Sequence, residues 1–203
     1  YPDEGSYQKF VSTHDGFSNA YTADDRTNYH FEIDPDYLEE GLDRFSQFFL
    51  GPLFNQELIE RELKAVNSEH SKNIPNDFRR IRQVKRKAFE ENHPARNFAT
   101  GTLETLADVT REELLDFYNR HYSSNRMMLA IAGPQQLDTL QDWVVPRFAS
   151  VKNLNLNQKR FPSKYMKTDT RFRLMRVKTI KDTRSLTLMF ALPKTLHYYK
   201  SQP

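Results

Sequence analysis

Apolar residues in the first quarter of the chain recur at the spacing of a helix that is buried along one side. Leu38, Leu42 and Phe45 lie three or four residues apart, which predicts a helix over residues 36–50. Asp34 precedes this stretch as a cap, with a proline next to it at the helix start. Similar patterns predict helices over residues 4–14, 76–91, 110–121 and 135–150.

Shorter stretches have the pattern of strands. Tyr29, Phe31 and Ile33 alternate with polar residues, which predicts a half-buried strand over 27–33. Further strands are predicted at residues 17–22, 127–132, 172–179 and 186–192. Because strands and helices do not alternate regularly, the pattern favours an α+β fold, an antiparallel or mixed sheet with helices packed on it. Residues 151–166 are rich in asparagine and polar residues and are predicted to be a linker.

One further predicted helix, residues 54–70, carries two glutamates on its apolar side. With Leu58 placed at 0° and about 100° per residue, Ile59 lies at about 100°. Glu62 and Glu69 fall at about 40° and 20°, inside the same arc. An amphipathic helix gains no packing energy from carboxylates on its buried side. The pattern therefore predicts two inward-facing carboxylates.

The two glutamates allow more than one interpretation. A buried carboxylate is costly unless it meets a cation, a hydrogen-bond donor or a metal ion. Glu62 and Glu69 are about 10 Å apart along the helix axis, so one could bind a metal while the other orients a neighbouring ligand. The alternative is a partly hydrated helix boundary where both pair with Arg or Lys. Two glutamates turned to water would remove this chemical argument.

Composition excludes several classes of protein. The chain has 30 Lys and Arg against 27 Asp and Glu, a net charge of +3, without a basic cluster interleaved with stacking aromatics. This gives no case for nucleic-acid binding. The basic run at residues 79–87 suits a solvated helix face. The sequence has no cysteine and no apolar run of about 20 residues, so we expect a soluble protein without disulfides or a membrane span. Composition does not choose between the cytoplasm and a bacterial periplasm, and both are left open.

Residues 61–70, RELKAVNSEH, resemble a specific helix in the insulysin/pitrilysin family of zinc metallopeptidases, the helix that carries the third zinc ligand. The resemblance extends over essentially all 203 residues in the family's order. The other matching segments are YPDE (1–4), SNAYT (18–22), RTNY (26–29), DRFSQFF (43–49), GTLETL (101–106), YSSN (122–125) and YYKS (198–201). Ser46 departs from the alanine that is usual in the family.

The resemblance implies roles for four residues. Glu69 would be a zinc ligand, and Glu62 would steady a ligand histidine without binding the metal itself. The strand that contains Asn19 and Ala20 would hold the substrate by its backbone, beside the zinc. The implied cofactor is zinc, and the implied substrates are peptides or small unfolded proteins. From the residues alone, the strand over 17–22 could equally be an ordinary interior strand or an open edge.

The family's signature is missing from this sequence. His-x-x-Glu-His supplies two zinc ligands and the general base, and it belongs just before the YPDE match. None of the six histidines has the required neighbours. We therefore expect a piece of a metallopeptidase that starts just after the signature helix and is by itself inactive and without tightly bound zinc. The alternatives are a non-catalytic family subunit that acts as a binding or structural partner, and a peptide-binding module unrelated to zinc.

The resemblance also implies a division of the chain. Residues 1–158 would form a catalytic-type domain that lacks its first strands and signature helix. Residues 159–203 would hold the linker and the opening strands of a second domain of similar plan. Missing strands leave sheet edges and apolar surface open, which favours self-association.

Overall fold

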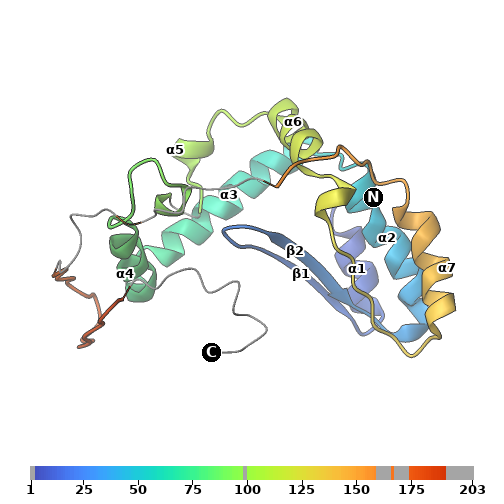
Figure 1. The fold of residues 1–203 in the computed structure, drawn as a ribbon, viewed down its shortest axis with the longest axis horizontal. Helices are drawn as coiled ribbons and strands as arrows, with labels where there is room; N and C mark the ends of the chain where they lie inside the picture. Colours follow the sequence, from blue (N-terminus) through green and yellow to red (C-terminus); the bar gives the residue numbers. More distant parts are fainter. Residues whose placement is uncertain (1–2, 98–99, 159–165, 167–173, 191–203) are drawn as a thin grey trace.

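The computed structural model describes residues 3–97, 100–158, 166 and 174–190, which form an α+β fold (Figure 1). The α-helices are α1 (Ser6–Thr13), α2 (Leu38–Leu50), α3 (Gln56–Asn73), α4 (Asp77–Arg86), α5 (Leu103–Leu106), α6 (Arg111–His121) and α7 (Leu137–Phe148). The strands are β1 (Phe17–Thr22) and β2 (Thr27–Glu32), and the 3-10 helices are η1 (Pro35–Tyr37), η2 (Pro94–Arg96) and η3 (Ser124–Arg126). The predicted fold class is confirmed.

Strands β1 and β2 form an antiparallel hairpin that starts directly after α1. Phe17 pairs with Glu32 and Thr22 with Thr27. Gly16 is required at the entry to the hairpin, because a Cβ there would lie 2.1 Å from the carbonyl oxygen of Glu32. The hairpin is the one sheet in the described part of the chain.

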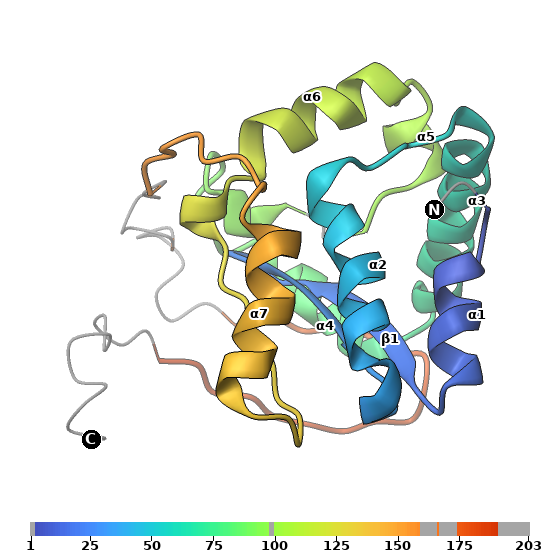
Figure 2. The same ribbon diagram turned by 90° about the vertical axis from the view of Figure 1, so that its right-hand side faces the viewer.

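The core lies where α1, α2 and α7 pack against the base of the hairpin (Figures 1 and 2). Val11 of α1 is completely buried and lies in a cluster with Phe45 of α2. Leu42 and Leu140 join α2 to α7, and Phe31 of β2 packs against both clusters. The apolar stripe predicted for residues 36–50 is therefore the centre of the fold.

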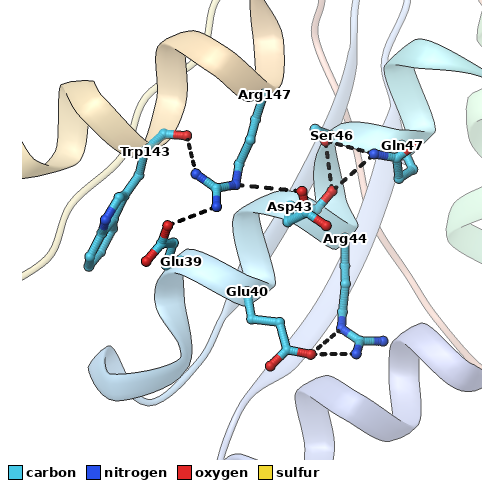
Figure 3. A network of polar contacts seen from close by, with 8 residues as sticks. All are labelled: Glu39, Glu40, Asp43, Arg44, Ser46, Gln47, Trp143 and Arg147. Atoms are coloured by element: carbon cyan, nitrogen blue, oxygen red, sulfur yellow. Dashed lines mark hydrogen bonds and ion pairs between the residues drawn. The ribbon is translucent and has the colours of Figure 1, made fainter.

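Polar contacts surround α2, and those of Arg147 connect it to α7 (Figure 3). Arg147 of α7 donates to Glu39 at 2.8 Å and to the carbonyl oxygen of Trp143 at 2.7 Å, and its Nε lies 3.6 Å from Asp43. Glu40 accepts from Arg44 one turn further along α2. The guanidinium of Arg147 thus bridges two helices that the core holds side by side.

The remaining helices form an arch beyond the hairpin (Figure 1). Asn67 of α3 accepts a hydrogen bond from the backbone of Leu103 at the start of α5, at 3.1 Å. Arg111 at the start of α6 donates to the carbonyl oxygen of Leu53, just before α3, at 3.0 Å. Helix α6 begins with the predicted capping box, in which Thr110 accepts from the backbone of Glu113 and Glu113 accepts from that of Thr110.

Several predicted strands do not form in the described residues. Residues 127–132, 174–179 and 186–190 have no strand partner there, so these predictions are wrong for those ranges. A strand exists through hydrogen bonds to a neighbour, and the apolar sequence cannot supply that neighbour. Residues 172–173 and 191–192, at the ends of two predicted strands, lie outside the described residues.

Segment 174–190 is joined to α4 through Asp77. The two carboxylate oxygens of Asp77 accept from the backbone N–H groups of Lys181 at 3.0 Å and Ile180 at 2.8 Å. These bonds hold the pKa of Asp77 below its ordinary value. Most of residues 159–203 lie outside the described part, and the division of the chain at 158/159 stays a prediction.

Candidate functional site

Glu62 and Glu69 both lie on α3, as predicted, but neither is buried. Both side chains are exposed to solvent, and Ile59 is the one buried residue of the helix. The prediction of two inward-facing carboxylates is therefore wrong. The chemical argument that depended on their burial cost no longer supports a metal role.

The exposure follows from where the buried side of α3 is centred. The half-buried residues Leu63, Val66 and His70 lie at about 140°, 80° and 120° on the angular scale used above. Their mean is close to Ile59 at about 100°. The half-buried Leu58 at 0° marks one edge of the packed side, and Glu62 and Glu69, at about 40° and 20°, stand near that edge. A helical projection shows which residues share one side of a helix. It does not show how much of that side is buried by neighbouring elements.

The two glutamates have no polar partner in the part of the chain that the structure describes. No hydrogen bond or ion pair reaches either carboxylate there, whereas Arg61, the residue before Glu62, pairs with Glu4. Pairing with Arg or Lys, which the zinc-independent interpretation requires, is thus not seen within the described ranges. Nor do three or more His, Asp or Glu side chains gather anywhere in those ranges as a metal site would need.

The outer edge of β1 is open in the described structure. Ala23 donates to the carbonyl oxygen of Arg26, so these two residues form a hydrogen-bonded pair next to the turn. Along an antiparallel ladder, hydrogen-bonded pairs alternate with pairs whose backbone groups point away from the partner strand. The Ala20–Tyr29 pair is therefore a non-bonded one, and the backbone groups of Ala20 point to the outer edge. The side chain of Asn19 accepts from the Ala20 N–H at 2.8 Å, so this edge donor is internally satisfied.

Tyrosine hydroxyls join the hairpin to the end of α6. The Tyr29 hydroxyl lies 2.5 Å from the hydroxyl of Tyr122, which follows α6 directly. Tyr29 is half-buried, and burial together with this bond raises its pKa well above the ordinary tyrosine value. Tyr118, one helical turn before Tyr122, donates to the carbonyl oxygen of Phe49 at 2.6 Å. The sequence match at residues 122–125 marks this corner but does not reveal the contact.

A hollow of about 530 Å³ opens at the first turn of α3. It is lined by charges of both signs, including Glu4, Arg61 and Arg111. Neither Glu62 nor Glu69 lines it. The hollow is thus separate from the residues that the sequence singles out.

Arg86 departs from the solvated face predicted for residues 79–87. It is 7% exposed, whereas its neighbour Lys87 lies at the surface. Its guanidinium donates to the carbonyl oxygens of Ala95 and Asn97 and lies 3.6 Å from Asp24. The sequence offers no signal that separates Arg86 from the other basic residues of the run.

Comparison with known proteins covers nearly the whole chain. The protein-family model described as "Insulinase (Peptidase family M16)" matches residues 1–92. The family model described as "Peptidase M16 inactive domain" matches residues 108–203. The structure of pitrilysin superposes with a TM-score of 0.77 at 30% identity, covering 82% of this chain and 18% of pitrilysin.

Curated relatives match from end to end. Human insulin-degrading enzyme is 41% identical over 210 residues, and Arabidopsis thaliana insulin-degrading enzyme-like 1, peroxisomal, is 40% identical over 210 residues. Each alignment covers 100% of this chain but only 21% and 22% of these relatives. The chain therefore spans about a fifth of the length of the curated relatives it matches. None of the helices in its described ranges is both long and apolar enough to cross a membrane.

The two family models, the end-to-end relatives and the shared fold agree with one another and with the segments recognised in the sequence. The chain belongs to the insulinase (M16) family of zinc metallopeptidases.

Proposed function

We propose that this chain is part of a zinc metalloendopeptidase that hydrolyses peptides or small unfolded proteins. In this proposal Glu69 is the third zinc ligand and Glu62 steadies a ligand histidine. The carrying observation is the match to the insulinase family over residues 1–92, which include α3 and both glutamates. Neither carboxylate has an ion-pair partner in the described residues that a metal ion would have to displace. A carboxylate committed to an ion pair would have to give up that pair before it could bind a metal ion.

The residues described here do not form a zinc site by themselves. Glu69 offers one carboxylate, while catalytic zinc sites use three protein ligands and leave a position for water. The proposal therefore assigns the other two ligands to the histidines of a His-x-x-Glu-His segment, which this chain lacks. Zinc bound there would lower the pKa of its water and polarise the peptide carbonyl.

The open edge of β1 is the proposed place for the substrate backbone. An extended peptide can add to an unpaired strand edge through main-chain hydrogen bonds. Ala20 directs its backbone groups to this edge, and Asn19 covers the N–H of Ala20 with its side chain. A bound peptide would replace this internal bond with its own carbonyl oxygen. The side chain of Asn19 would then turn toward solvent, where it is already exposed.

The decisive experiment is to determine the sequence encoded upstream of Tyr1. We expect His-x-x-Glu-His within the helix that immediately precedes it. An upstream sequence without these residues would contradict the peptidase proposal and identify a non-catalytic family member.

A second experiment uses the 203-residue chain alone. It should neither hydrolyse peptides nor hold zinc tightly, because one carboxylate does not make a site. If the purified chain cleaved a peptide and a chelator abolished that cleavage, the result would contradict the proposal that zinc binding needs two histidines outside this chain.

A further inference from the structure

The turn of the β1–β2 hairpin reaches an element far from the core. Figure 1 shows the turn end directed away from α1, α2 and α7, toward α4. Within the described residues, Asp24 supplies the one ion pair between turn 23–26 and another element, to Arg86 of α4 at 3.6 Å. The neighbouring Asp25 pairs instead with Arg26 inside the turn, at 3.0 Å.

Arg86 is itself held rigidly. Its Nη1 donates to the carbonyl oxygen of Ala95 within η2, at 3.0 Å, and to that of Asn97 directly after η2. Its side chain is 9% exposed, whereas that of Asp24 is 72% exposed. The planar guanidinium can serve several acceptors at once, which a lysine ammonium does less well. One buried cation thus connects the end of α4, the η2 loop and the hairpin turn.

A two-stranded hairpin is marginally stable unless it packs against other elements. The base of this hairpin packs on the core through Phe31, and Tyr29 bonds to Tyr122 near its middle. Toward the turn, residues 21–28 are exposed apart from Ala23, so apolar packing holds this end weakly. The peptide-accepting part of β1 at Asn19 and Ala20 lies between the held base and this exposed end.

We propose that Arg86 is a positioning residue for peptide binding: it holds the hairpin turn through Asp24 and so keeps the edge of β1 in a fixed orientation. This inference rests on the proposed role of β1 as the substrate edge. Arg86 acts through Asp24 and touches no substrate. It thus lowers the entropy that β1 would lose when a peptide pairs with it.

Asp24→Asn is the sharpest test, because it removes the ion pair from the exposed side and leaves the buried bonds of Arg86 in place. Asp25→Asn is the matched control, with the same change one residue away. Both are made in the full-length protein that contains this chain. Amide hydrogen exchange of residues 17–32 reports on the hairpin, and KM and kcat for a peptide substrate report on binding and turnover.

We expect D24N to speed exchange in the hairpin and to raise KM about two- to fivefold, with kcat nearly unchanged, while D25N changes neither. Arg86→Lys should give the same signature, because a compact ammonium lacks the planar, forked donors with which Arg86 reaches the two loop carbonyls and Asp24 together. Unchanged exchange in D24N would overturn the positioning role itself. Faster exchange with unchanged KM would instead overturn the role of β1 as the substrate edge, so the two claims fail separately.

Discussion

The hydroxyls of Tyr29 and Tyr122 meet at 2.5 Å, although 93 positions separate them in the chain. Tyr29 comes from the middle of the hairpin and Tyr122 from the end of α6. The contact joins the candidate peptide edge to the helical arch that also carries α3 and its two glutamates. The relative placement of β1 and α3 depends on such contacts as well as on the core.

Removing either hydroxyl should destabilise the fold. Tyr29→Phe or Tyr122→Phe is expected to lower the free energy of unfolding by about 1 kcal/mol, because each leaves a partner hydroxyl without its bond. Tyr37→Phe is the control, since the Tyr37 hydroxyl has no hydrogen bond in the described residues. Urea denaturation measures the difference. Equal midpoints for Y29F and Y37F would show that the Tyr29–Tyr122 bond contributes nothing.

Stability should fall at alkaline pH partly through Tyr29. Its pKa is raised in the folded protein, first by burial and then by the bond to Tyr122. Above about pH 10 the unfolded chain releases this proton while the folded chain keeps it, so the free energy of unfolding falls as pH rises. Below that pH Tyr29 is protonated in both states and does not change how the free energy of unfolding depends on pH. Between about pH 9 and 11, the midpoint of urea denaturation should decline less steeply with pH in Y29F than in the parent protein.

The bridge made by Arg147 should be worth more than an exposed ion pair. Arg147→Met is expected to cost about 1–2 kcal/mol, because two acceptors, Glu39 and the carbonyl oxygen of Trp143, lose a largely buried donor and Asp43 loses an ion-pair partner. Arg120→Met removes a pair with Asp116 that is exposed on both sides and should cost less than about 0.5 kcal/mol. Chemical denaturation compares the two variants. A loss for R147M no larger than that for R120M would contradict the assigned bridge.

Self-association remains a prediction, and the structure supplies a place to test it. Met128 is 95% exposed in segment 127–132, which has no strand partner in the described residues, and the outer edge of β1 is open there too. Light scattering on the 203-residue chain should show a mass that rises with concentration, and Met128→Lys should weaken this rise. Leu137→Lys, a comparable change at an exposed position on α7, is the control. A monomer at every concentration would refute the prediction.

Periodicity predicted the helices well because each helix satisfies its own backbone. The stripe through Leu42 and Phe45 and the capping box at Thr110 are local signals, and both appear as expected. The hairpin was also predictable, because its two strands are joined by a short polar turn. Segment 127–132 has an equally strong apolar signal but needs a partner strand, which no local pattern can provide.

The candidate site was predicted less completely for a related reason. Spacing placed Glu62 and Glu69 together on α3 but could not say which neighbouring elements cover that helix. Arg86 shows the opposite case, a residue inside a basic run that becomes buried through contacts with Asp24 and the η2 loop. Burial of a charged side chain is decided by tertiary neighbours, and a one-dimensional pattern does not contain them.

The zinc content of the full-length protein tests the central claim most directly. The parent protein and Glu60→Gln, a control on the same helix, should each hold about one zinc ion per chain, as a single catalytic site requires. Glu62→Gln should weaken zinc binding about 10- to 100-fold, as loss of a supporting carboxylate does. Glu69→Gln should lose the metal on dialysis while keeping its helical circular dichroism. Full zinc occupancy in E69Q would contradict the assignment of Glu69 as a ligand.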